Sequence, residues 1–229
     1  MKTLLKITIT LFIATFFTAC NKQAEEAVAP AFKLDGKYIS GYITYSQSVS
    51  QDVPQPYSMR LLADNQLVWN EFAGEKTGTY TYANKELICN FSTGNILVLY
   101  IDEATNQVTP KSNSARTWKV NSEGKLVSKL GQTPTSNPFL GGTYFGSITV
   151  YPDKTVIPNF SLVVDKSAFY TGVTGTGDKV DYTLIGNTAY KAISGKNNYF
   201  SVLIDGKMAL LVLNGSQMAT GLLSPVTIN

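Results

Sequence analysis

The sequence predicts an all-β protein of two tandem antiparallel β-meander modules, each of them a small barrel or a sandwich. Three observations support this. Segments of strand length recur every 10–12 residues or so, residues that favour turns separate them, and blocks of similar sequence occur twice in the same order. After residue 32, no stretch keeps the 3.6-residue apolar period that indicates an amphipathic helix.

The internal repeat comprises five pairs of blocks, offset by about 91–106 residues. The pairs are residues 36–44 with 142–149, 56–62 with 158–164, 80–84 with 182–187, 99–102 with 202–205, and 124–126 with 215–218. Five blocks in one order are hard to explain by chance. The repeat therefore predicts two copies of one fold.

Each copy is predicted to contain about eight short strands. Residues 97–101 and 209–213 are continuous apolar runs of strand length. Turn residues punctuate the runs, and the clearest are Asp205-Gly206 and Asn214-Gly215, because these dipeptides accept the positive φ of tight hairpins. The pattern favours a meander in which neighbouring strands pair.

The polar, proline-bearing segment 132–138 is predicted to be a linker. It separates a first module at 33–131 from a second at 139–229, and each is long enough to have its own core. The alternative is that both copies close into one larger β structure. The linker favours two modules.

Residues 1–19 have the pattern of a signal peptide, with Lys2 and Lys6 ahead of an apolar stretch at 7–17. The apolar stretch is shorter than the roughly 20 residues that a membrane-spanning helix needs. Small residues precede Cys20. Cleavage before Cys20 is the expected result, and an ordinary signal peptide with an incidental cysteine is the alternative.

The segment Phe17-Thr18-Ala19-Cys20 resembles the lipobox of bacterial lipoproteins, with Phe17 in place of the usual leucine. The resemblance implies acylation of Cys20 and anchoring to the outer membrane, on the periplasmic face or at the cell surface. Residues 20–32 are expected to form a flexible tether. Within it, Glu25-Glu26 resemble a loose form of the surface-export signal of Bacteroidetes-like lipoproteins, and a solvated linker is an equal alternative.

Composition excludes several classes of function. The chain contains no histidine, which rules out histidine-based catalysis and histidine metal ligands. Without residues 1–19 the chain is nearly neutral, whereas a nucleic-acid-binding protein needs a basic face. With Cys20 acylated, Cys89 is the remaining thiol, and its alternation with Leu87 and Phe91 predicts a buried strand position. We expect no cofactor and no metal.

Each copy opens with Gly-Lys-Tyr or Gly-Thr-Tyr, at residues 36–38 and 142–144. This opening is similar to the Gly-x-Trp/Tyr start of lipocalin-like meander barrels, which many small exported lipoproteins share. The resemblance implies ligand binding or a structural role without catalysis. Each copy is short for a complete lipocalin, so a hollow interior does not follow from it.

Aromatic residues near polar side chains are the candidate ligand-binding positions, because their faces stack on apolar groups and sugar rings. The candidates are Trp69, Tyr45, Tyr80, Trp118 and Tyr182, and simple strand packing is the more common role for residues in such positions. The leading prediction is a non-catalytic envelope module that binds a small apolar ligand or a glycan. Its alternatives are a structural or protein-interaction module and, least favoured, a hydrolase using carboxylates such as Glu71.

Overall fold

A computed structural model of the chain describes residues 32–45, 53–113, 118–120, 128–172 and 177–226. Cys20, the leader and the tether lie outside these residues. So does the block at 124–126 of the internal repeat. Within the described part of the chain, no helix has the length and apolar character needed to cross a membrane.

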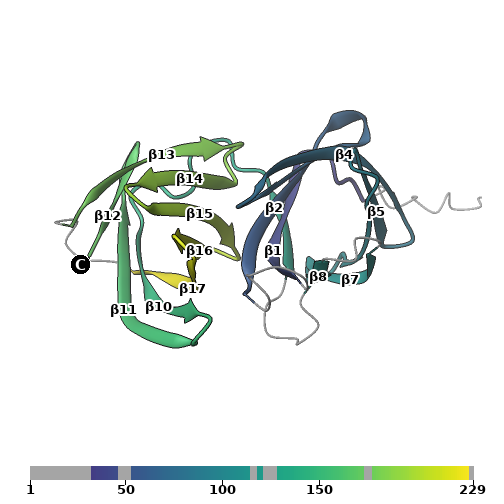
Figure 1. Cartoon of the computed structure of the whole chain (residues 1–229). Coiled ribbons are helices and arrows are strands. Elements are labelled where there is room, and N and C mark those ends of the chain that lie inside the picture. Colours follow the sequence, from purple (N-terminus) through teal and green to yellow (C-terminus); the bar gives the residue numbers. More distant parts are fainter. Residues whose placement is uncertain (1–31, 46–52, 114–117, 121–127, 173–176, 227–229) are drawn as a thin grey trace, which may run out of the picture. The chain divides into compact units, whose positions relative to one another are not determined.

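The first module is a barrel of consecutive antiparallel strands (Figure 1). Its strands are β1 (Lys37–Tyr45), β2 (Gln55–Leu61), β3 (Gln66–Glu71), β4 (Gly74–Ala83), β5 (Glu86–Phe91), β6 (Ile96–Asp102), β7 (Gln107–Asn113), β8 (Trp118–Val120) and β9 (Ser128–Gln132), with a 3-10 turn, η1 (Ala63–Asn65), after β2. β1 pairs with β2 on one side and with β9 on the other, which closes a ring of eight strands. β8 pairs with the end of β1 beyond β9.

The second module is a closed barrel of eight strands, each antiparallel to its neighbours (Figure 1). Its strands are β10 (Thr143–Tyr151), β11 (Thr155–Val164), β12 (Ala168–Thr171), β13 (Lys179–Ile185), β14 (Ala189–Ser194), β15 (Asn197–Ile204), β16 (Lys207–Asn214) and β17 (Gln217–Val226). β17 returns to pair with β10 and closes the ring. The predicted all-β fold of two tandem meander modules is confirmed, with barrels rather than sandwiches.

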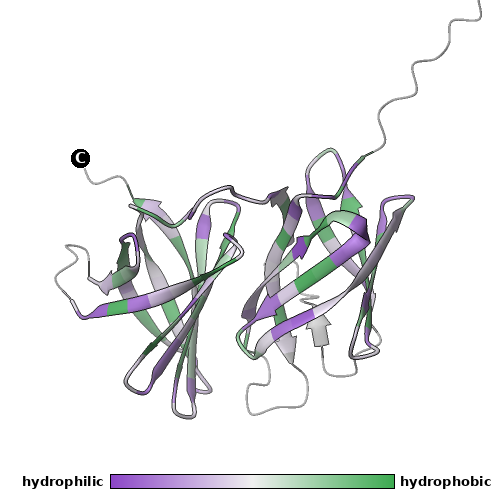
Figure 2. Ribbon diagram, turned by 90° about the horizontal axis from the view of Figure 1, so that it is seen from above, coloured by the Kyte–Doolittle hydropathy of each residue, from purple (hydrophilic) through white to green (hydrophobic). Residues whose placement is uncertain are grey.

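The internal repeat corresponds to equivalent strands of the two barrels. Its four described pairs of blocks fall on β1 and β10, β2 and β11, β4 and β13, and β6 and β15. Because side chains alternate across a strand, each barrel packs one face inward. In β5, for example, Leu87, Cys89 and Phe91 are buried while Ile88 and Asn90 are exposed. The same alternation of hydrophobic and hydrophilic residues is visible along many strands in Figure 2.

Of the two clearest predicted turns, Asn214-Gly215 is shifted by one residue, since Asn214 pairs with Gln217 and leaves Gly215 and Ser216 as the turn. Asp205-Gly206 forms the turn that the sequence predicts. Asp205 and Gly206 both have positive φ, 52° and 75°, and they join Ile204 to its partner Lys207 in a two-residue turn. Positive φ is costly for most residues, but Gly accepts it freely and Asp accepts it better than most. The local sequence therefore determines where β15 ends and β16 begins.

The two barrels contact each other within one compact unit, residues 34–229. Tyr42 of β1 packs against outward-facing apolar residues of the second barrel, among them Phe200 and Val202. The Ser58 and Thr188 hydroxyls form a buried hydrogen bond of 2.8 Å between the barrels. These contacts explain why the second barrel has buried residues on the outside of its sheet as well as in its core.

Candidate functional site

The interior of the second barrel is filled with aromatic rings at one end. We call this the closed end, and it carries the β11–β12, β13–β14 and β15–β16 turns. Phe139, which precedes β10, is fully buried there, and its ring meets that of Tyr190 edge to face at 5.0 Å. Tyr190 also lies 5.7 Å from Phe169 and 5.1 Å from Tyr182. These rings pack against one another at the closed end.

The opposite end of the barrel is hollow. We call it the pocket end, and it carries the β10–β11, β12–β13, β14–β15 and β16–β17 turns. A cavity of about 260 Å³ lies there. Its walls are mainly apolar, and they include Ile148, Val150, Phe160, Tyr199, Val212 and Ala219. Mouths of β-barrels are common ligand sites, and this volume is just below the roughly 300–1,000 Å³ typical of drug-sized ligands.

Three carboxamide side chains line the cavity on adjacent strands. Asn197 begins β15, Asn214 ends β16 and Gln217 begins β17. Asn197 is paired with Asn214 in the strand register, and Asn214 is paired with Gln217. We call these three residues the amide row. Carboxamides both donate and accept hydrogen bonds without carrying charge, so the row provides polar contacts beside an apolar hollow.

Tyr199 lies between the amide row and the core. It is buried, and its ring meets Phe169 edge to face at 5.0 Å. Burial raises the pKa of the Tyr199 hydroxyl, a hydrogen bond with Asn197 lowers it, and the negative charge of Asp178 raises it further. The hydroxyl therefore stays neutral at physiological pH.

Two of the candidate tyrosines, Tyr80 and Tyr182, make the same kind of contact in the two barrels. The Tyr182 hydroxyl donates to the backbone carbonyls of Asp165 and Lys166 at 2.8 and 3.2 Å, in the turn between β11 and β12. The Tyr80 hydroxyl donates to the carbonyl of Leu62, at the equivalent turn of the first barrel, at 3.3 Å. Each hydroxyl thus links its own strand to the turn that precedes the neighbouring strand. Neither residue lines the cavity.

Trp69 is fully buried in the core of the first barrel. Its ring stacks on Tyr57 with a centroid distance of 4.1 Å and an interplanar angle of 6°, and Phe91 approaches it edge-on at 5.8 Å. Trp69 therefore presents no open platform for a sugar ring. The other two candidates, Tyr45 and Trp118, are register partners on β1 and β8, and their side chains lie outside the described part of the structure.

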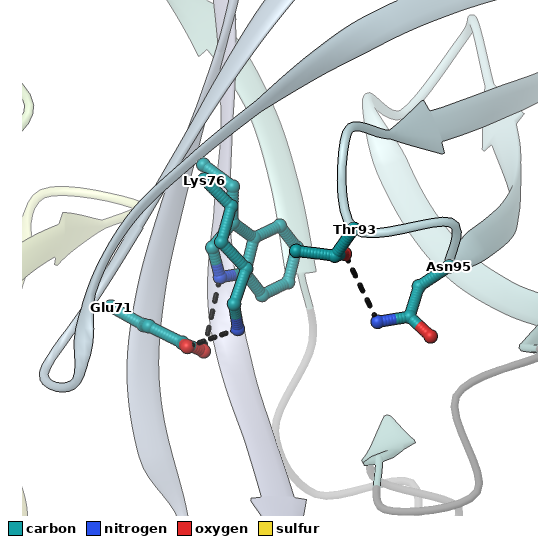
Figure 3. Close-up of polar contacts among 5 residues, drawn as sticks. Glu71, Lys76, Thr93 and Asn95 are labelled. Atoms are coloured by element: carbon teal, nitrogen blue, oxygen red, sulfur yellow. Dashed lines mark hydrogen bonds and ion pairs between the residues drawn. The ribbon is translucent and has the colours of Figure 1, made fainter.

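A charged cluster adjoins Trp69. The Trp69 indole Nε1 donates to the Glu71 carboxylate at 3.1 Å, and Lys76 forms an ion pair with the same carboxylate (Figure 3). The Glu71 side chain is only 2% exposed, and that of Lys76 is 24% exposed. Glu86, another acidic residue of this barrel, pairs with Lys111 instead. Glu71 is thus held by a cation and an indole donor.

Cys89 occupies the buried position that its alternation with Leu87 and Phe91 predicts. Its thiol lies 3.7 Å from the Met59 sulfur, and burial raises its pKa to about 12. The thiol is therefore protonated at physiological pH, whereas nucleophilic cysteines need the thiolate. Among the described residues, no group of three or more acidic or cysteine side chains is placed to hold a metal ion.

The cavity and the amide row were missed by the sequence analysis, which looked for aromatic residues. The pairing of Asn214 with Gln217 does not follow from the sequence either, because a two-residue Asn-Gly turn would pair Leu213 with Ser216, whereas the turn in the structure is Gly215-Ser216. No local sequence pattern indicates that the packed core ends before these residues and leaves a cavity beside them. A comparison with known protein families, with curated proteins and with solved structures finds no match to this chain.

Proposed function

We propose that this protein is a non-catalytic binding module that holds a small apolar ligand at the pocket end of its second barrel. The observation that carries the proposal is the apolar cavity of about 260 Å³ at that end. It contrasts with the closed end of the same barrel, which Phe139 and Tyr190 fill.

The physical reason for binding is the hydrophobic effect. Apolar surface that leaves water on entering a preformed hollow contributes roughly 25 cal/mol per Å². The surrounding strands are already paired on both sides, so the protein orders little of itself on binding. The ligand must be small, because Tyr199, whose ring packs on Phe169 in the core, forms part of the cavity wall.

Replacing Ala219 by phenylalanine is expected to weaken ligand binding in the second barrel. Ala219 lines the cavity and is only partly buried, so a benzyl group there occupies the space that a ligand needs. We expect the affinity for N-phenyl-1-naphthylamine, a neutral fluorophore that brightens in apolar surroundings, to fall at least about tenfold, a loss of 1.4 kcal/mol. Fluorescence titration of the full chain measures this affinity.

Ala83→Phe is the matched control, because Ala83 is an exposed strand residue in the first barrel. It adds the same side chain without entering the cavity, so it should bind the fluorophore as the unchanged protein does. Both variants keep the apolar stretch at residues 7–17, which therefore cancels in the comparison. Equal binding by all three proteins would refute the cavity as the site and favour a structural or protein-interaction module.

We further propose that the protein is a lipoprotein of the cell envelope, of a lipocalin-like kind, held at the outer membrane by acyl chains on Cys20. The support is the signal-peptide pattern of residues 1–19 and the small residues before Cys20. Two or more acyl chains bind a bilayer durably, since each buried CH₂ contributes about 0.8 kcal/mol.

Changing Cys20 to serine is expected to prevent acylation, because serine lacks the thiol that accepts the lipid. Growth of an expressing bacterium with an alkyne-bearing fatty acid should label the unchanged protein and leave Cys20→Ser unlabelled. Cys89→Ser is the control, since Cys89 is buried in the barrel core, and it should be labelled like the unchanged protein. Labelling of the Cys20→Ser protein would contradict the proposal.

A further inference from the structure

The polar side of the cavity carries information about the ligand that the apolar walls do not. All of its described polar lining residues, Thr171, Asn197, Asn214 and Gln217, are uncharged. Three of them form the amide row on β15, β16 and β17, side by side in the strand register. A ligand with its apolar part in the hollow therefore places its other end within reach of several neutral donors and acceptors.

We propose that the ligand is an uncharged amphiphile, whose apolar chain fills the cavity and whose amide or hydroxyl head is hydrogen-bonded by the amide row. This inference rests on the proposed function and specifies the ligand's chemistry. Carboxamides suit such a head because each offers both a donor and an acceptor. Asn197 and Tyr199 both line the cavity from β15, two residues apart on the strand.

A charged head fits the cavity less well. Moving an ion from water into a partly apolar site is costly unless an opposite charge compensates it. No lysine, arginine or acidic side chain is among the described residues that line the cavity. Asp178, whose negative charge raises the pKa of Tyr199, is exposed, so water screens its effect on a charged head of either sign.

Four probes with the same eight-carbon chain test the inference: octanamide, 1-octanol, octanoate and octylammonium. Each is titrated at pH 7 against the full chain loaded with N-phenyl-1-naphthylamine, and the displacement constant is measured. Octanamide and octanol are expected to bind about tenfold more tightly than octanoate and octylammonium, the effect of one to two net hydrogen bonds.

The double variant Asn214→Leu with Gln217→Met removes two carboxamides while keeping similar side-chain bulk. In this variant octanamide should bind about tenfold more weakly, because it loses its hydrogen bonds to the two carboxamides. Asn90→Leu is the matched control, as Asn90 is an exposed asparagine on β5 of the first barrel, and it should bind octanamide as the unchanged protein does.

The outcomes separate the two proposals. If octanoate or octylammonium displaces the fluorophore as well as octanamide does, the ligand is not selected for a neutral head, while the cavity remains a binding site. An affinity for octanamide that is unchanged in the double variant overturns the role of the amide row. If the fluorophore itself fails to bind to the unchanged protein, the proposed function fails and this inference fails with it.

Discussion

Replacing Phe139 by alanine is expected to lower the free energy of unfolding by about 3–4 kcal/mol, the range for a buried phenylalanine that leaves a cavity. Phe139 lies outside the strands, yet it is fully buried and belongs to the main core cluster of the second barrel. Its ring packs edge to face on Tyr190. The loss is large because the strands of a closed barrel have little freedom to collapse into the space.

The segment that carries Phe139 is held by its own hydrogen bonds. The Asn137 side chain accepts from the backbone N–H of Phe139 at 3.0 Å, and it also bonds the Tyr182 hydroxyl. These bonds place the ring at the closed end in the correct orientation. Without the ring, the segment loses its apolar contact with the barrel, so Phe139→Ala is expected to open the closed end to water.

Denaturation in urea, followed by circular dichroism and by tryptophan fluorescence, measures this effect. Both tryptophans, Trp69 and Trp118, lie in strands of the first barrel, so their fluorescence reports on that barrel separately. Phe145→Ala is the matched control, because Phe145 is on β10 of the same barrel but is 37% exposed. A midpoint for Phe139→Ala no lower than that for Phe145→Ala would show that the ring does not stabilise the barrel.

Replacing Lys76 by methionine is expected to lower the free energy of unfolding by about 3 kcal/mol, the lower part of the range for breaking a buried ion pair. Glu71 is almost fully buried and loses its ion-pair partner in this variant, whereas the methionine keeps most of the side-chain bulk. The lower part of the range applies because Lys76 is partly exposed and water already shares in its solvation. Tryptophan fluorescence during urea denaturation follows the change, since the Trp69 indole donates to Glu71.

Two further variants separate the cost of breaking this ion pair from the loss of packing. Adding Glu71→Gln to Lys76→Met is expected to restore most of the stability, because the neutral amide oxygen still accepts from Trp69. Lys111→Met is the matched control, since Lys111 pairs with Glu86 and both side chains are exposed by a third or more. That pair should contribute under about 1 kcal/mol. Equal losses for Lys76→Met and Lys111→Met would contradict the expectation.

Much of the fold follows from local sequence signals. The Asp205-Gly206 dipeptide predicts its hairpin because backbone conformation at a turn depends on the turn residues themselves. Leu87, Cys89 and Phe91 predict an inward face because alternation is a property of one strand. The repeat adds long-range information, since a second copy of the same strand order predicts a second copy of the same fold.

The candidate site is harder to predict from the sequence than the fold, because it depends on residues that are distant in the sequence. Trp69 and Tyr182 were reasonable candidates by residue type, but Trp69 stacks on Tyr57 and Tyr182 binds a turn. Which aromatic side chains fill a barrel depends on the combined volume of all the side chains that point into it from its strands. The ion pair of Glu71 with Lys76 joins residues that are close in the sequence, since β3 and β4 are joined by a short turn.

The sequence by itself determined that this chain forms two all-β modules, where most of the strands lie, and which residues turn them. These properties depend on interactions within about ten residues, or on similarity between the two copies. Only the tertiary structure decided that the second barrel is filled at one end and hollow at the other. Closure between β10 and β17 encloses the cavity, and the strand register from β15 to β17 aligns its three carboxamides. Both depend on pairing and packing across the whole ring of strands, which no single segment encodes.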